Sequence, residues 1–169
     1  QALKNINAGD YDEAVDWARQ ALALAPERLD VLDAMAWAQA GSLALQVAKS
    51  KIETASSYLT RPNRSQADLQ SAQGPLKEAL QLDGMPLAAI ETGGAAPKAE
   101  IGKRPFTLSA KQRTKIEQLQ KEVELRLIAG QQVEDARKND DPFAEVEAWK
   151  TLIGLGLSET ENASLQRAS

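Results

Sequence analysis

The most constraining feature of the sequence is a turn followed by a helix and a closing proline, within residues 9–26. Gly9 suits the turn because glycine adopts positive φ angles without steric cost. Asp10 is a good N-cap, and Glu13 can complete a capping box with it. Pro26 ends the helix because it cannot donate a backbone hydrogen bond. Small residues recur along one side of this helix, so we expect it to pack closely against a neighbour; they are Ala14, Ala18 and Ala21.

The composition favours helices throughout. Hydrophobic residues make up 43% of the 169 residues but aromatic residues only 4%, and alanine and leucine supply most of the apolar content. Both favour helix, whereas a β-sandwich would need more β-branched and aromatic residues. The length is enough for one domain with its own core. We therefore predict an all-α protein.

The stretch resembles the second helix of a tetratricopeptide repeat. The residues that carry the resemblance are Gly9, Tyr11, Ala14, Ala18, Ala21 and Pro26, which stand where that family has its turn glycine, turn aromatic, three packing positions and closing proline. Ala72, Leu76 and Ala79 repeat the spacing of the three alanines. The resemblance implies TPR-like antiparallel helical hairpins stacked as a short solenoid. The alternative interpretation is an ordinary helical hairpin with an alanine-rich seam.

Residues 28–60 allow two interpretations. They contain no proline, and Gly41 is their only glycine. A regular repeat would turn at Gly41 and begin a second helix at about residue 43. One long helix would instead tolerate Gly41 at a cost of about 1 kcal/mol. The residues beside Gly41 favour helix, so we favour the long helix, which would make the repeats enlarged and irregular.

The rest of the chain predicts further helices over residues 65–83, 109–138 and 142–153, and a short one after Ser158. Polar pairs with capping-box spacing precede three of them: Ser65 with Asp68, Ser109 with Gln112, and Ser158 with Glu161. Asp141 followed by Pro142 predicts the remaining start. We expect proline at position 75 to kink its helix or restart it.

The predicted organisation has three segments. Residues 1–83 are TPR-like helical hairpins, and residues 107–169 form a second helical hairpin with a short C-terminal helix. Between them, residues 84–106 are rich in glycine and proline, which is typical of a linker or a surface loop. A flexible connector is the favoured interpretation of this segment and a docking peptide the alternative.

No residue pattern indicates an enzyme, a cofactor or a metal site. The chain has no cysteine and no histidine, which excludes thiolate nucleophiles, Cys/His zinc sites and imidazole acid–base catalysis by its own residues. No phosphate-binding glycine loop occurs. Four carboxylates cluster at one helix start, namely Asp10, Asp12, Glu13 and Asp16, but acidic residues are favoured there by the helix dipole.

The predicted partner is another protein. A net charge of −4 gives no reason to expect nucleic acid, and no apolar run approaches the roughly 20 residues that span a bilayer. The compartment, cytoplasm or periplasm, stays open. The composition gives an impression of bacterial origin, and the chain begins in what resembles mid-helix, so we expect a fragment of a longer protein.

The resemblance implies a non-enzymatic scaffold that binds a partner peptide or helix on a concave helical surface. Carried over by position, Arg28, Met35 and Gln39 would face that groove, and Trp37 is a further candidate. We expect Trp17, Trp37 and Trp149 to serve packing. The alternative is a structural domain that associates with copies of itself, and sedimentation would separate the two hypotheses.

Overall fold

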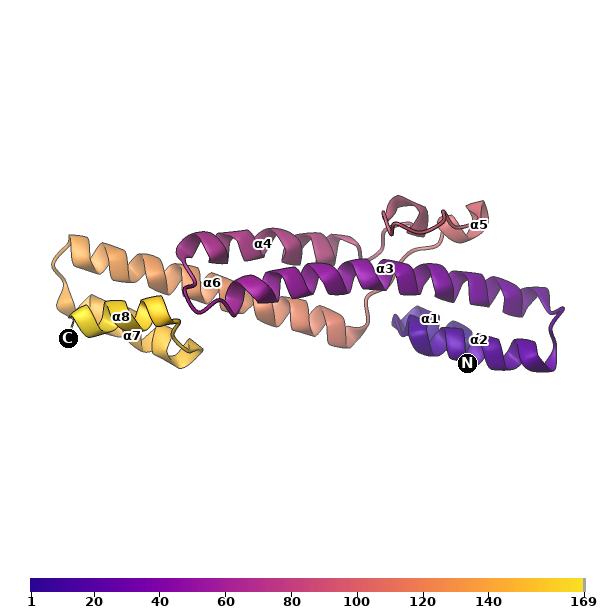
Figure 1. Cartoon of the computed structure of the whole chain (residues 1–169), viewed down its shortest axis with the longest axis horizontal. Helices are drawn as coiled ribbons and strands as arrows, with labels where there is room; N and C mark the ends of the chain where they lie inside the picture. The colour runs from indigo at the N-terminus through magenta and orange to yellow at the C-terminus, as the bar shows by residue number, and fades with distance from the viewer. Residues whose placement is uncertain (169) are drawn as a thin grey trace. The chain divides into compact units, whose positions relative to one another are not determined.

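The computed structural model describes residues 1–168, which form eight α-helices, one 3-10 turn and no strand (Figure 1). The elements are α1 (Ala2–Ala8), α2 (Tyr11–Leu24), α3 (Leu29–Leu59), α4 (Gln66–Gln81), η1 (Leu87–Ala89), α5 (Ala99–Gly102), α6 (Ala110–Lys138), α7 (Pro142–Leu155) and α8 (Glu159–Ala168). The all-α prediction is confirmed.

Close contacts divide the chain into two compact units. Unit 1 contains residues 1–51 and 78–116, and unit 2 contains residues 52–77 and 117 onward. Each unit is therefore assembled from two stretches that are distant in the sequence, and the division falls inside α3, α4 and α6. The three predicted segments follow the order of the chain instead, and as domains they stay a prediction.

Four of the five side-chain caps that the sequence predicts are formed. Ser65 and Asp68 exchange hydrogen bonds, with the Ser65 N–H donating to the carboxylate at 2.8 Å and the Asp68 N–H donating to the hydroxyl at 3.2 Å. Ser109 with Gln112 and Ser158 with Glu161 form the same box, and Asp141 accepts from the N–H of Ala144. The box predicted at Asp10 is wrong, because the Asp10 side chain makes no capping hydrogen bond.

Residues 29–59 form one helix, as favoured, and the aromatic ring of Tyr11 explains Gly41. A Cβ atom on Gly41 would lie 2.1 Å from that ring, which is far inside van der Waals contact. The ring also stacks on Phe106 at a centroid distance of 5.6 Å, and the Tyr11 hydroxyl accepts the N–H of Thr107 at 2.8 Å. Gly41 therefore lets α2 approach α3 and does not mark a turn.

Pro75 lies inside α4, which continues through it without a break. The residue before a proline is normally pushed out of helical geometry because its Cβ clashes with the proline ring. Gly74 has no Cβ, so the pair removes this clash. The predicted restart of the helix at Pro75 is wrong, and the alternative, a kink, stays a prediction.

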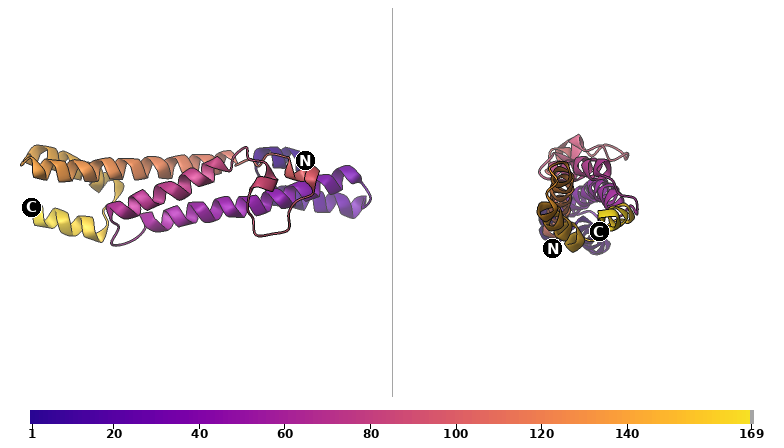
Figure 2. Two further views of the ribbon diagram at one scale, coloured as in Figure 1. Left: turned by 90° about the horizontal axis from the view of Figure 1, so that it is seen from above. Right: turned by 90° about the vertical axis from the view of Figure 1, so that its left-hand side faces the viewer.

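Residues 84–106 pack into unit 1, so the expectation of a flexible connector is wrong. Four apolar side chains of this segment are buried: Leu87, Ile90, Ile101 and Phe106. A bridge pairs Pro86 with Pro105, and the N–H of Gly84 donates to the carbonyl of Phe106 at 2.8 Å. Figures 1 and 2 show this segment, with α5, running alongside α3.

The small residues of the predicted seam lie mostly where two helices meet. Ala14 and Ala18 are buried in unit 1, together with Tyr11 and Ala38. Ala21 is only half-buried and Pro26 is exposed, so the close packing covers the first part of α2. Ala72, Leu76 and Ala79 are buried as the repeated spacing predicts.

Unit 2 has a small apolar core made by α6 and α7. Its buried residues are Ala129, Val133, Ala148, Trp149 and Leu152. Beside it, the guanidinium of Arg126 is buried and donates to the carboxylate of Glu122 and to the carbonyls of Leu155 and Gly156. This arginine satisfies carbonyls that the end of α7 leaves free, and its charge complements the negative end of the helix dipole.

Candidate interaction surfaces

The residues predicted to line a groove lie on α3 in unit 1, but not all on one side of it. Arg28 precedes the helix and is exposed, Gln39 is exposed and Met35 is half-buried. These three are spaced by seven and four residues, so they share one side. Trp37 lies two residues from Met35 and hence about 200° around the helix axis. The structure therefore separates Trp37 from the other three.

Trp37 packs under the segment 84–106. The guanidinium carbon of Arg104 lies 4.3 Å from the centroid of its indole ring, within the range of a cation–π contact. The indole N–H is buried and has no partner among the described residues. Trp37 is therefore half-buried against this segment, and its role in packing or in partner binding stays a prediction. Trp149 is also buried, but Trp17 is 41% exposed, so the packing prediction is wrong for Trp17.

A second apolar side of α3 faces away from α2. Gly41 faces Tyr11 of α2, whereas Leu43, two residues further, lies 3.2 Å from the position that a Cβ on Gly94 would occupy. Residues spaced by whole turns from Leu43 share its side. We call this set the outer stripe of α3; it consists of Leu29, Leu32, Ala36, Leu43 and Val47.

The outer stripe is covered at one end only. Leu43 and Val47 are half-buried, and with Thr92 they line a groove of about 320 Å³. Toward the start of α3 the cover is lost, since Leu32 is 42% exposed and Leu29 is 76% exposed. The sequence reveals this apolar pattern, but only the placement of segment 84–106 shows which end stays open.

A second exposed apolar surface lies on α7 in unit 2. We call it the outer face of α7; it consists of Phe143, Val146 and Ile153, and Phe143 is 86% exposed. Trp149 and Leu152 of the same helix are buried. Between α7 and α8 the surface continues into an apolar groove of about 270 Å³, to which Trp149 and Leu165 contribute.

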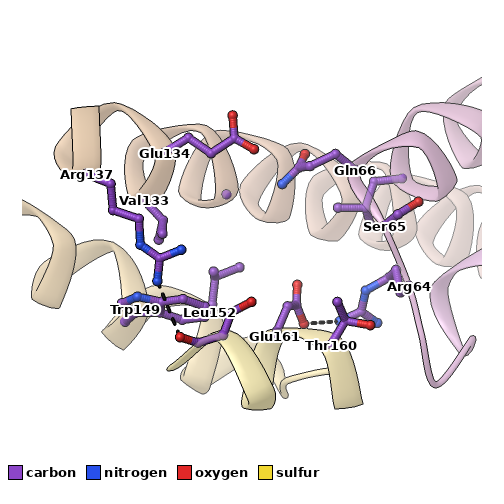
Figure 3. Close-up of a pocket in the computed structure, with 13 residues that line it drawn as sticks. Arg64, Ser65, Gln66, Val133, Glu134, Arg137, Trp149, Leu152, Thr160 and Glu161 are labelled. Atoms are coloured by element: carbon purple, nitrogen blue, oxygen red, sulfur yellow. Dashed lines mark hydrogen bonds and ion pairs between the residues drawn. The ribbon is translucent and has the colours of Figure 1, made fainter. Parts of the chain in front are cut away.

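A smaller pocket in unit 2 has a polar rim and an apolar floor (Figure 3). It measures about 210 Å³, and Val133 and Leu152 form part of its floor. At one side Arg64 pairs with Glu161 at 2.9 Å. Opposite, Arg137 donates to the carbonyl of Ser164 at 3.4 Å. Its arginines are thus already used inside the protein, and the volume is below the usual range for ligand sites.

The charges beside this pocket also serve the protein's own structure. Glu145 accepts from Arg137 at 2.7 Å and from the indole N–H of Trp149 at 3.2 Å. These bonds, with that from Arg137 the stronger, hold the pKa of Glu145 below its usual value. At the start of α4, hydrogen bonds from Ser65 lower the pKa of Asp68, to which Arg61 adds. We see structural ion pairs here and no poised acid or base.

Two of the four carboxylates clustered at the start of α2, Asp12 and Asp16, bind different partners. Asp12 accepts from Ser42 at 2.6 Å and lies 3.5 Å from the ammonium of Lys49, while Asp16 pairs with Arg19 at 3.3 Å. Within residues 1–168, no three acidic side chains converge as a metal site would require. Nor does any helix in this range combine the length and apolar character needed to cross a bilayer.

Comparison with known proteins identifies no relative. No protein-family model matches the sequence. Neither the curated proteins nor the solved structures contain a match.

Proposed function

We propose that this chain is a non-enzymatic scaffold that binds another protein, as a TPR-like module of a larger protein or assembly. The observation that carries the proposal is the open end of the outer stripe of α3, where Leu29 and Leu32 are exposed. Exposed apolar patches on folded proteins often mark sites of protein–protein contact. The predicted groove residues Arg28, Met35 and Gln39 lie on the side of α3 next to Leu32, which extends the same surface.

The TPR-like character rests on the packing of helices through small residues. Ala14 and Ala18 allow α2 to lie close to its neighbours, and Ala72 and Ala79 have the same role in α4. Stacked helical hairpins leave broad surfaces that bind other chains. The long α3 departs from a regular repeat, so we propose an enlarged and irregular version of this architecture.

A selection experiment tests the proposal. The purified chain would be used to select binders from a displayed library of helical peptides, and the affinities of the selected peptides would be measured by fluorescence anisotropy. We expect micromolar dissociation constants that rise at least tenfold in the double variant Leu29→Ser/Leu32→Ser. Phe143→Ser, which replaces an exposed apolar side chain of unit 2 with a hydroxyl, is the control. The absence of binders, or binders indifferent to the double substitution, would refute the proposal.

A second candidate function, self-association, is favoured by the outer face of α7. Phe143, Val146, Lys150 and Ile153 follow the spacing of positions a and d in a heptad. An antiparallel pair of α7 helices, centred near residue 148, would place Phe143 against Ile153 of the second copy. Glu147 and Lys150, which pair at 2.5 Å within one chain, would be equally able to pair between chains. The spacing and the opposite charges of this face are thus compatible with pairing between two copies.

Sedimentation equilibrium between 1 and 500 µM tests the second candidate, a range chosen because single-helix interfaces are weak. We expect a monomer–dimer equilibrium that Phe143→Ser shifts at least tenfold toward monomer and that Leu29→Ser leaves unchanged. A chain that stays monomeric at the highest concentration would exclude self-association through this face.

A further inference from the structure

The surroundings of the outer stripe of α3 indicate which kind of partner it binds, an inference that rests on the proposed function. Residues 10–35, which contain α2 and the exposed Leu29 and Leu32 of the stripe, hold seven acidic residues and two arginines. This stretch alone therefore has a charge of −5, while the whole chain has −4. Four of these acidic residues lie at the start of α2, and the charged residues next to Leu29 and Leu32 in the sequence are Glu27, Arg28, Asp30 and Asp33, which sum to −2.

Much of this charge is not neutralised within the protein. Arg19 pairs with Asp16, Arg28 pairs with Asp30, and Lys49 of α3 reaches Asp12. Among the described residues, no ion pair within 4 Å involves the other four acidic residues of the stretch, which are Asp10, Glu13, Glu27 and Asp33. Two of these, Glu27 and Asp33, lie within two residues of Leu29 or Leu32 in the sequence.

This charge argues against several occupants. A second copy of the chain bound at the same place would bring the unpaired carboxylates Glu27 and Asp33 of both copies together, and like charges across an interface are costly. Nucleic acid and anionic membranes would be repelled for the same reason. The partner that complements the surface carries positive charge beside an apolar surface.

The geometry selects the form of that partner. An added β-strand needs an exposed sheet edge, and residues 1–168 contain no strand. A polyproline segment needs a groove lined by aromatic rings, whereas the stripe consists of leucine, alanine and valine. A helix with apolar residues at every third or fourth position matches a helical stripe of the same period. The open part, from Leu29 to about residue 40, is about 17 Å long, or three turns.

We infer that the open end of the outer stripe of α3 binds an amphipathic helix of about three turns, with an apolar stripe flanked by lysine or arginine. Its apolar residues pack on Leu29, Leu32 and Ala36. Its positive residues lie beside Glu27 and Asp33. This assignment names a partner chemistry that the proposed scaffold function leaves open.

Three labelled peptides of 14 residues test the inference by fluorescence anisotropy. The first has leucines at helical spacing flanked by lysines, the second replaces the lysines with glutamates, and the third scrambles the leucines of the first. We expect the first to bind with a micromolar dissociation constant and the other two at least tenfold more weakly. Raising the salt from 50 to 500 mM is expected to weaken the first peptide, because exposed charges are screened.

Matched charge variants locate the site. Glu27→Lys/Asp33→Lys is expected to weaken the lysine peptide at least tenfold. Glu117→Lys/Glu124→Lys makes the same change of charge on exposed positions of α6 in unit 2, and is expected to change affinity less than twofold. Equal loss in both variants would overturn the assignment of the site.

The outcomes separate this inference from the scaffold proposal. The lysine and glutamate peptides could bind equally well, with binding lost in Leu29→Ser/Leu32→Ser. That result would overturn the positive charge inferred for the partner and leave the scaffold proposal intact. Equal binding of the scrambled lysine peptide would show attraction by charge alone and overturn the helix assignment. If none of the three peptides binds, the inference is overturned, and the library selection decides the scaffold proposal.

Discussion

The two units each contain a helix that is apolar on two sides, and the comparison shows that charge distinguishes their open faces. In unit 1, α3 buries Ala34 and Ala38 on one side and leaves Leu29 open on another. In unit 2, α7 buries Trp149 and leaves Phe143 open. Beside the first open face, Glu27 and Asp33 take part in no ion pair among the described residues, whereas Glu145 and Glu147 of α7 pair with Arg137 and Lys150. The exposure of apolar side chains alone does not indicate whether a face binds a different protein or a second copy of this chain.

The units also differ in how their helix ends and close approaches are stabilised. Unit 2 uses a buried guanidinium, that of Arg126, at the end of α7. Unit 1 uses an aromatic ring, that of Tyr11, seated on Gly41. The contact in unit 2 depends on the hydrogen bonds of the Arg126 guanidinium, whereas the contact in unit 1 depends on Gly41 having no side chain.

The largest expected effect comes from removing the buried guanidinium. Arg126→Met would leave the carboxylate of Glu122 and two carbonyls without a donor, and we expect the free energy of unfolding to fall by about 3 kcal/mol. Arg19→Met removes an exposed ion pair in unit 1 and should cost no more than about 0.5 kcal/mol. Urea denaturation followed by circular dichroism measures both. Equal losses in the two variants would contradict the role given to Arg126.

A pair of glycine substitutions tests the close approach in unit 1. Gly41→Ala would place a methyl group against the ring of Tyr11, and we expect a loss of about 1–3 kcal/mol through overpacking. Gly154→Ala adds the same methyl group within α7, where nothing lies within 4 Å, so it should gain up to about 1 kcal/mol from helix propensity. Thermal melts would check the opposite signs, and stabilisation by Gly41→Ala would disprove the packing argument.

A crossed experiment tests the difference between the open faces. Leu29→Ser/Leu32→Ser should weaken binding of the lysine-flanked peptide at least tenfold without changing sedimentation, because the substituted leucines lie outside α7. Phe143→Ser should shift sedimentation toward the monomer without changing the binding of the lysine-flanked peptide. Anisotropy and sedimentation on the same two preparations provide the full comparison. If either variant altered both readouts, the two faces would not be functionally separate.

The smallest expected effect is the dependence of stability on pH. The pKa values of Asp68 and Glu145 in unit 2 are lowered by folding, so their stabilising contribution is present above the unfolded pKa of about 4 and lost as the pH falls through the folded value. Burial raises the pKa of Tyr11 in unit 1, so its contribution is present below about pH 10 and lost above it.

Hydrogen exchange resolved along the chain can follow the two trends separately. We expect protection in α7 to decrease first at acid pH and protection in α2 to decrease first at alkaline pH. Tyr11→Phe is the control, since it should abolish the alkaline trend and leave the acid trend. If protection in α2 were still lost at alkaline pH in Tyr11→Phe, a group other than Tyr11 would be responsible.

Local chemistry made much of the secondary structure predictable from sequence. The pairs Ser65 with Asp68 and Ser109 with Gln112 form their capping boxes because each pair needs only its own turn of helix. The box at Asp10 fails although its spacing is right: the carboxylate makes no capping bond, and the turn is closed by backbone bonds to Asn5 and Ile6.

The candidate surfaces were less predictable. The apolar positions of α3 and α7 are visible in the sequence, yet Trp17 was expected to pack and is exposed. A periodic pattern shows that a helix has an apolar side but does not show whether a neighbour covers it. The coverage of Leu43 by segment 84–106 depends on the path of a stretch that the sequence suggested was a connector.

The sequence by itself determined that this protein is helical, where most helices begin and end, and that its negative charge gathers in residues 10–35. These properties depend on interactions within a few residues or on composition alone. Only the tertiary structure decided that residues 84–106 pack, that Gly41 serves a contact with Tyr11, and which apolar sides stay open. Those outcomes depend on contacts between residues far apart in the chain, whose free energies are set by how surfaces fit and not by local pattern.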